Sequence, residues 1–599
     1  MPESRPNAPP QAALPAAATL AWPVAASVAL AVPALLAYNF PPSATFLNQA
    51  TALIGWGGFL AWVAFALPAR AMPREAGSLA LLAMFALLLA AALAAPLWTG
   101  LPWSLALSSA GLIAAALLAA LVGGAAQRGG LGEAAFRAFC IGMVVAGVAS
   151  SVVGIVQVYA PQWADGDWVA RSGLPGRAVG NLRQPNHLSS LLLWSLIAVV
   201  WLGDALALRR VATALLGLLL VFGVVLSGSR TGALGMGLLA LWGVLDQRLS
   251  RPARWMLVLA PVAYGLCWLG ASAWADHGHQ VFGGETRFST KGDISSSRYG
   301  IWANTLALIR MHPWAGVGFG EFNFAWTLTP FPGRPVAFFD HTHNLPLQFA
   351  VELGLPLAAT VLGLLGWALV AAWRGSLQAG TDADPAQAPL RRAAFVMVLM
   401  VLLHSLLEYP LWYAYFLLPA AFAFGLCLAG PVRTEAAAAP AARAGAPAEE
   451  ATRPLLIAAL LLMLGGVGSV ADFARVVVIF APPEGAAPLA QRIIDGRHSV
   501  FFAHHAAYAA VTTSEHPSEA MASFLRAPHY LLDSRLMMAW ATALGEAGDA
   551  DRARYIAQRL KEFRNEQAAP FFAACDAPAT SPPFQCALPA RGFVYEDFR

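Results

Sequence analysis

Residues 77–97 read GSLALLAMFALLLAAALAAPL, an uncharged apolar run with the length needed to cross the hydrocarbon core of a bilayer. Similar runs recur along most of the chain. We expect membrane spans at residues 20–38, 51–69, 77–97, 103–123, 137–159, 187–207, 211–227, 231–247, 255–275, 346–372, 393–411, 413–431 and 454–474. The sequence therefore predicts an all-α polytopic membrane protein with about 13 transmembrane helices.

The composition agrees with a membrane protein. Of the 599 residues, 58% are hydrophobic and 12% are charged, whereas soluble domains carry about 25% charged residues. The net charge of +4 is small, so it gives no support for nucleic-acid binding. The first apolar run lacks the basic start of a signal peptide and has full span length, so we expect it to be retained.

Arginines in the connecting loops predict the orientation of the chain. If the N-terminus is cytoplasmic, every short cytoplasmic loop carries arginine, and the opposite short turns at 39–50 and 98–102 carry none. Loops 160–186 and 276–345 and the tail 475–599 are then expected to face the periplasm.

The expected organisation has five parts. These are a cytoplasmic tail (1–19), a twelve-span core with the large periplasmic loop (20–431), an Ala/Pro-rich cytoplasmic linker (432–453), an additional span (454–474) and a periplasmic helical domain (475–599).

The tail contains a predicted helical hairpin. Residues 532–546 and 552–563 form two amphipathic segments around a short Gly/Asp turn. One such unit cannot bury its apolar face alone, so we expect it to pack on residues 485–525 or on the membrane core. Cys575 and Cys586 lie in the same tail, where a disulfide is expected if the tail is outside the cytoplasm; two free thiols are the alternative.

Two arginines are candidates for binding an anion. Arg230 stands where one span turns into the next; a charge this close to hydrocarbon is a functional candidate, and an interfacial anchor is the alternative. Arg298 precedes apolar residues at helical spacing over 301–311. We expect it at the N-terminus of an interfacial helix, where the helix dipole favours anions, or else in an exposed loop.

A histidine pair ends the large loop. His341 and His343 precede Asn344 and Pro346, and a proline suits the first turn of the following span. A helix N-terminus keeps imidazole neutral, so His343 is the candidate general base, and His341 has no assigned role. A structural histidine and a metal site are the alternatives, although His-x-His supplies too few metal ligands.

Further polar residues cluster at the outer ends of two spans. Gln184, Asn186 and His187 open the sixth span, where they suit hydrogen bonding to a sugar or phosphate, or ordinary helix capping. Glu408 and Tyr409 close the eleventh span, and Glu408 requires a partner, either Arg230 or Arg298. Arginines that clamp a diphosphate, beside a histidine that deprotonates a hydroxyl, fit one reaction.

At these positions the chain resembles the O-antigen ligase/polymerase superfamily of bacterial inner membranes. The shared features are Ser229-Arg230-Thr231-Gly232, the segment from Arg298 through Trp302 to 312–318, and a large loop that ends in His343-Asn344. Segments 181–187, 341–348 with 352–354, and 408–413 are more similar to the PglL-type protein O-oligosaccharyltransferases, which glycosylate pilins.

The resemblance implies a glycosyltransferase without metal or other cofactor. It would move an oligosaccharide from undecaprenyl diphosphate to Ser/Thr hydroxyls of an exported protein, such as a type IV pilin, at the periplasmic face. It assigns the diphosphate to Arg230 and Arg298 and catalysis to His343. The supporting or glycan-contacting residues are then Gln184, Asn186, His187, His341, Asn344, Glu408 and Tyr409.

Three other functions are open. The first is an O-antigen ligase that acts on lipid A core, and the second is an O-antigen polymerase. The third is a flippase or transporter of lipid-linked glycans, which the scarcity of charges in the middle of the spans disfavours.

Overall fold

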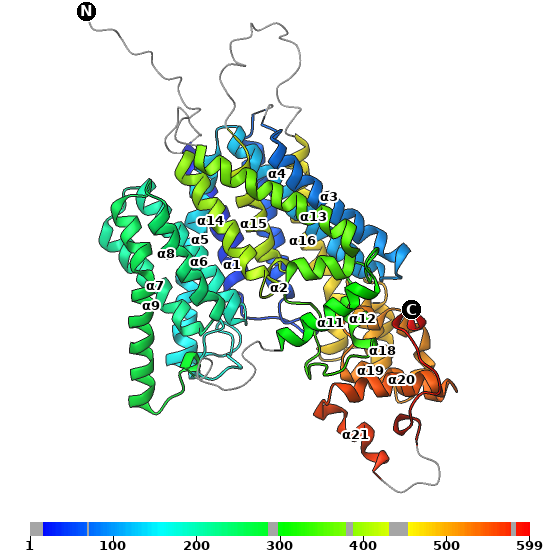
Figure 1. Ribbon diagram of the computed structural model, residues 1–599. Helices are drawn as coiled ribbons and strands as arrows, with labels where there is room; N and C mark the ends of the chain where they lie inside the picture. The colour runs from blue at the N-terminus through cyan, green and yellow to red at the C-terminus, as the bar shows by residue number, and fades with distance from the viewer. Residues whose placement is uncertain (1–15, 69–70, 286–296, 379–386, 431–452, 577–582) are drawn as a thin grey trace, which may run out of the picture.

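The computed structural model describes residues 16–68, 71–285, 297–378, 387–430, 453–576 and 583–599 (Figure 1). Each expected span coincides with a helix. These helices are α1 (Ala16–Leu35), α2 (Phe46–Phe65), α3 (Ala76–Trp98), α4 (Trp103–Arg128), α5 (Gly132–Tyr159), α6 (Pro185–Ala205), α7 (Arg210–Ser227), α8 (Arg230–Leu245), α9 (Arg251–Gly278), α13 (Leu345–Gln378), α14 (Gln387–Ser405), α15 (Ala414–Leu428) and α16 (Arg453–Phe480).

Nine helices in the described ranges are long and apolar enough to cross a membrane. The described part of α1, α8 and α15 are apolar but shorter. The structure therefore supports a multi-pass, all-helical protein, whereas the number of thirteen crossings stays a prediction.

The start of α2 differs from the expected span at 51–69, because the helix begins at Phe46. The additional turn carries Asn48, whose buried amide donates to the carbonyls of Pro33 and Leu36, both at 2.8 Å. A buried amide that is fully hydrogen-bonded costs little, so the helix extends into residues that hydropathy alone places outside the span.

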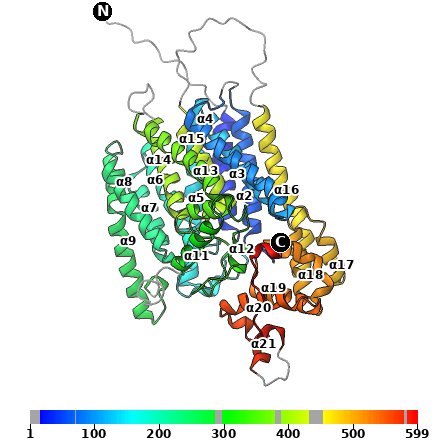
Figure 2. The same cartoon turned by 45° about the vertical axis from the view of Figure 1, so that its right-hand side comes forward.

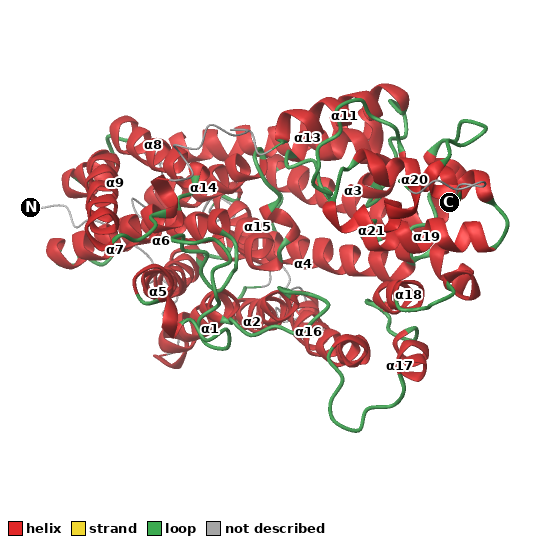
Figure 3. Ribbon diagram, turned by 90° about the horizontal axis from the view of Figure 1, so that it is seen from below, coloured by secondary structure: helices red, strands yellow, loops and turns green. Residues whose placement is uncertain are grey.

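The spans form one elongated bundle. Figures 1 and 2 show α7, α8 and α9 along one side, and α16 beside α2 on the other. Seen from below in Figure 3, α7–α9 and the C-terminal helices lie at opposite ends, with α6, α14 and α15 between them. The C-terminal helices are α17 (Leu489–Gly496), α18 (Ala503–Thr512), α19 (Ser534–Glu546), α20 (Ala550–Glu562) and α21 (Ala569–Phe572).

The large loop and the tail share one hydrophobic core. The loop forms α11 (Arg298–Met311) and α12 (Phe322–Leu328), whose buried residues pack with those of α19 and α20. Tyr555 Oη donates to the carbonyl of Leu328 at 2.7 Å, and the backbone amide of Leu532 donates to Asn323 at 2.8 Å. The predicted hairpin is α19–α20, but the expectation that it packs on 485–525 or the membrane core was incomplete, because the large loop supplies much of its apolar partner surface.

A break in α13 joins two distant sequence motifs. Gly354 has non-helical backbone angles, with φ 74° and ψ 163°. The last helical turn before Gly354 pairs with the segment around Gly316 (φ 67°). The amide of Val317 donates to the carbonyl of Val351 at 2.8 Å. A Cβ on Gly316 would lie 2.6 Å from the carbonyl carbon of Glu352, so glycine is required both by the conformation and by the contact.

Candidate active site

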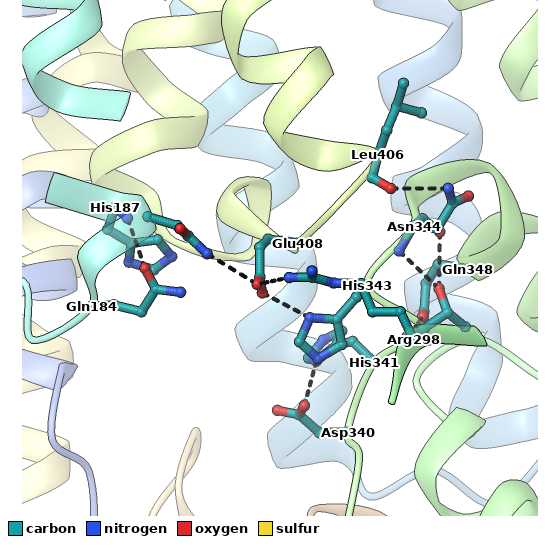
Figure 4. Close-up of polar contacts among 12 residues, drawn as sticks. Gln184, His187, Arg298, Asp340, His341, His343, Asn344, Gln348, Leu406 and Glu408 are labelled. Atoms are coloured by element: carbon teal, nitrogen blue, oxygen red, sulfur yellow. Dashed lines mark hydrogen bonds and ion pairs between the residues drawn. The ribbon is translucent and has the colours of Figure 1, made fainter. Parts of the chain in front are cut away.

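Glu408 is the centre of a buried polar cluster that joins three other chain segments (Figure 4). One carboxylate oxygen accepts hydrogen bonds from the guanidinium of Arg298 and, at 3.1 Å, from the side-chain amide of Asn186. The other oxygen lies 2.7 Å from Nδ1 of His343. The side chains of Arg298, His343 and Glu408 are 18%, 15% and 10% exposed, so the cluster is largely shielded yet still reached by solvent.

The side chains of this cluster are positioned by the ends of helices. Asn186 lies in the first turn of α6, directly after Pro185, and Gln184 caps that helix by accepting from the amide of His187 at 2.7 Å. Arg298 is the first residue of α11. Glu408 follows the end of α14, where its amide still bonds to the carbonyl of His404 at 2.9 Å. The cluster therefore collects the ends of three helices.

His343 sits in a strained turn before α13. Its φ of 56° is unusual for a residue with a side chain. The side chain of Asn344 holds the turn. Its oxygen accepts from the backbone amide of Leu347 at 3.1 Å, and its Nδ2 donates to the carbonyl of Leu406 at the same distance. This fixed turn aims the His343 ring at Glu408, as Figure 4 shows.

The neighbours of Glu408 control its charge. Burial raises the pKa of this carboxyl, but the hydrogen bond and charge of His343 and the charge of Arg298 lower it by more, to about 2. Glu408 is therefore an anion near neutral pH. An anionic carboxylate accepts hydrogen bonds only, so Nδ1 of His343 carries the proton that lies between them. In the neutral form of the His343 imidazole, the lone pair is then on Nε2.

The turn that carries Arg230 is connected to the same cluster. Ser229 caps α8 by accepting from the amide of Gly232 at 3.0 Å, and its hydroxyl donates to the side-chain oxygen of Asn186 at 2.6 Å. Asn186 thus bridges Ser229 and Glu408. Arg230, the first residue of α8, stands next to this bridge.

The sequence left the partner of Glu408 open between Arg230 and Arg298, and the structure shows the ion pair with Arg298.

His341 has a different carboxylate partner from His343. Its Nδ1 is 3.1 Å from a carboxylate oxygen of Asp340, and its ring stacks on Tyr409 with centroids 4.4 Å apart. Burial raises the pKa of Asp340, whereas the charge and hydrogen bonding of His341 lower it to about 2. The Tyr409 ring also meets His343 edge-on at 4.9 Å, so both histidines contact the same tyrosine ring.

Two predicted site residues have local partners. Gln184 acts as the cap of α6, which was the alternative interpretation of this segment. His187 is buried, with its ring 4.7 Å from that of Tyr413 and 5.2 Å from that of Phe416. Conversely, Ser229 and Asp340 belong to the network but were not among the predicted site residues; their adjacency to Arg230 and His341 was the available signal.

Two further sequence expectations concern metals and cysteines. Among the residues that the structure describes, no group of three or more His, Cys, Asp or Glu side chains is placed to hold a metal ion. Metal independence itself stays a prediction. Cys575 and Cys586 are joined by a disulfide.

Comparisons with known families match three parts of the chain. Residues 214–362 match a family described as O-antigen ligase, and residues 392–573 match the C-terminal part of a virulence factor membrane-bound polymerase. Residues 178–202 match a protein glycosylation ligase family. The cluster residues all fall inside these matches, with Asn186 in the third, Arg298 and His343 in the first, and Glu408 in the second.

Two curated relatives come from Acinetobacter baylyi (strain ATCC 33305 / BD413 / ADP1). A general O-oligosaccharyltransferase is 28% identical over 259 residues, which cover 42% of this chain and 43% of the relative. A ComP-specific O-oligosaccharyltransferase is 25% identical over 265 residues, which cover 42% and 44%. The aligned part thus spans less than half of either relative. Together with the family matches, these similarities confirm the resemblance predicted from sequence.

Proposed function

We propose that this chain, which belongs to the O-antigen ligase/protein glycosylation ligase family, transfers an oligosaccharide from undecaprenyl diphosphate to Ser/Thr hydroxyls of exported proteins. The acceptor is a pilin-like protein, and the reaction takes place at the periplasmic face of the bacterial inner membrane. The observation that carries the proposal is the cluster in which Glu408 binds both Arg298 and His343.

His343 is the general base of this reaction. Its Nδ1–H is held by Glu408 at 2.7 Å, which leaves Nε2 to accept the proton of the acceptor hydroxyl. The hydroxyl oxygen forms a bond to the anomeric carbon as the bond from that carbon to the diphosphate breaks. The imidazolium produced is stabilised by the anionic Glu408, in the way that a buried carboxylate supports a histidine base in other enzymes.

The arginines bind the departing diphosphate. Negative charge gathers on the diphosphate as its bond to the sugar breaks, so fixed cations stabilise the transition state more than the bound substrate. Arg298 is oriented by Glu408, and Arg230 begins the helix whose cap is tied to Asn186. The reaction as proposed includes no metal ion or other cofactor, because the arginines supply the positive charge.

Two features of the tail support the proposal that the site faces the periplasm. The Cys575–Cys586 disulfide is typical of a compartment outside the cytoplasm. The tail shares a core with the loop that carries Arg298 and His343, so the two lie on the same side. Both then face the periplasm, as the arginine distribution predicts.

Co-expression tests the function and its acceptor. The full chain is produced in bacteria that make a lipid-linked glycan and a candidate pilin, and the mass of the intact pilin is measured. We expect a glycan-sized increase that is lost with His343→Ala. Glycan on lipid A core with an unmodified pilin would instead establish the O-antigen ligase reaction.

A further inference from the structure

An apolar cavity runs into the helix bundle next to the active site. Its volume is about 380 Å³, which falls in the range of small-molecule binding sites. Its walls come from α3, α4, α13, α14 and α15, from the large loop and from the tail. The lining spans Leu81 to Leu88 on α3 and Leu105 to Ile113 on α4. At 1.5 Å per residue these stretches make the cavity roughly 10–12 Å deep.

The chemistry of the walls changes from one end to the other. Asn323, Asp340, His341, Glu352 and His529 provide polar groups at the end nearest the large loop. Along α3, α4, α14 and α15 the lining side chains are apolar apart from Ser109. Among the described residues that line the cavity there is no lysine or arginine. A phosphate group therefore has no cationic partner here, whereas an uncharged hydrocarbon chain fits.

A polypeptide is a poor occupant of the deep part of this cavity. Its backbone amides and carbonyls would lose their hydrogen bonds to water, at a cost of several kcal/mol for each unpaired group. The helix walls offer the single hydroxyl of Ser109 in return. A hydrocarbon chain has no such requirement, and burying it gains about 0.8 kcal/mol for each methylene group.

The cavity and the active site are one side-chain layer apart. His341 lines the cavity, its ring stacks on Tyr409 at 4.4 Å, and Tyr409 meets His343 at 4.9 Å. A donor whose diphosphate lies beside Arg298 therefore has its isoprenoid chain within reach of the cavity, past the rings of His341 and Tyr409.

We infer that this cavity holds the isoprene units of the glycan donor that lie nearest its diphosphate. The inference rests on the proposed function for the identity of the lipid. It assigns a role to the apolar residues along α3, α4 and α15 that line the cavity. The isoprenoid chain, once bound in the cavity, fixes the position of the diphosphate. This in turn places the anomeric carbon next to His343.

Photolabelling tests the binding site without requiring transfer. The full-length protein in nanodiscs is irradiated with a farnesyl phosphate that carries a diazirine at the far end of its chain, and the labelled peptides are identified by mass spectrometry. We expect labels on α3, α4 or α15. Ser109→Leu, which fills the cavity, lowers labelling by about tenfold. Gly111→Leu is the matched control on α4, because a Cβ there meets nothing within 4 Å, and it leaves labelling unchanged.

Other labelling outcomes would overturn the inference. Labels confined to other helices would place the chain elsewhere, as would equal labelling of wild type and Ser109→Leu. If a phosphatidylcholine with the same diazirine labels the site as strongly as the farnesyl probe and competes with it, the cavity binds bilayer lipid rather than the donor.

Transfer kinetics then connect the cavity to the reaction. Synthetic donors carry the same glycan diphosphate on geranyl or geranylgeranyl chains. We expect Ser109→Leu to raise the KM of the geranylgeranyl donor by about tenfold and to change the geranyl donor and the acceptor little. A raised acceptor KM with unaltered dependence on donor chain length would assign the cavity to the acceptor. If the wild type transfers nothing, the proposed function fails, and photolabelling alone decides on the cavity.

Discussion

At the residue scale, Glu408 has two partners that serve different halves of the proposed reaction. It holds His343, the proposed base, and Arg298, the proposed ligand of the leaving group. Glu408→Gln keeps the volume of the side chain but removes its charge and the acceptor that orients His343. We expect kcat to fall by about 10²–10⁴-fold at neutral pH.

The control for this variant is Glu133→Gln, which breaks a half-exposed ion pair with Arg137 on α5 and leaves kcat unchanged. Glycan transfer is measured with purified donor and acceptor. A Glu408→Gln enzyme with the kcat of the wild type would show that the carboxylate neither orients nor stabilises the base.

The charge of Glu408 also predicts a pH dependence of stability. Its pKa is lowered from the ordinary 4.5 to about 2, since the effects of His343 and Arg298 exceed that of burial. A depressed pKa means that the carboxylate stabilises the folded state above pH 4.5 and that this contribution is lost as pH falls toward 2. Thermal unfolding in detergent measures it. The stability advantage of wild type over Glu408→Gln should shrink below pH 4.5, and an advantage that grows on acidification would contradict the assignment.

Several of these residues could be predicted from the sequence as candidate site residues, but which of them contact one another could not. Charged residues at span ends stand out against apolar neighbours, which is why Arg230, Arg298, His343 and Glu408 were all selected. The choice of Arg298 rather than Arg230 as the partner of Glu408 depends on how α11 lies across the end of the bundle. That placement depends on contacts between residues far apart in the chain, which composition and spacing do not contain.

At the element scale, the break in α13 positions the loop that precedes it. Gly354→Ala would force a side chain onto a φ of 74° and into the backbone of Trp314 and Ala315. We expect destabilisation by about 2–3 kcal/mol in thermal unfolding and a matching loss of transfer activity. Gly363→Ala is the control on the same helix, because a Cβ there meets nothing within 4 Å. Equal stability of the two variants would show that the break is not required.

Helix existence was the most predictable level of structure. Nine of the described helices are long and apolar enough to cross a membrane, and every expected span overlaps a helix. Helix ends were less predictable, as α2 illustrates: Asn48 is buried because the carbonyls of Pro33, in α1, and Leu36, just after it, accept its amide protons. Hydropathy counts such a residue as polar and places it outside the span.

At the scale of the whole molecule, the tail and the large loop are one folded unit. Trp540 on α19 is 4% exposed and packs with Phe324 and Phe524. Trp540→Ala should destabilise this unit by about 3–5 kcal/mol and raise amide hydrogen exchange in α12, which belongs to the loop rather than the tail. Leu525→Ala, at a side chain that is 63% exposed, is the control. Unchanged exchange in α12 would show that the tail folds independently of the loop.

The sequence did not predict that the large loop and the tail share one hydrophobic core. The amphipathic pattern of α19 and α20 indicates that they need an apolar partner, but both the loop and the membrane core offered one. The partner becomes visible only through contacts such as the pairing of Tyr555 with Leu328, which are separated by more than two hundred positions. The consequence is functional, because the tail supports the loop that carries Arg298 and His343.

Single-turnover transfer with purified donor and acceptor separates the two proposed roles in the cluster. Binding of the undecaprenyl-diphosphate glycan and its transfer to the acceptor are followed in the same samples. His343→Ala should bind the donor with wild-type affinity and transfer it at least about 10²-fold more slowly, whereas Arg298→Ala should lose donor binding. Transfer by His343→Ala at the wild-type rate would contradict its role as the base and, with it, the proposed chemistry of the site.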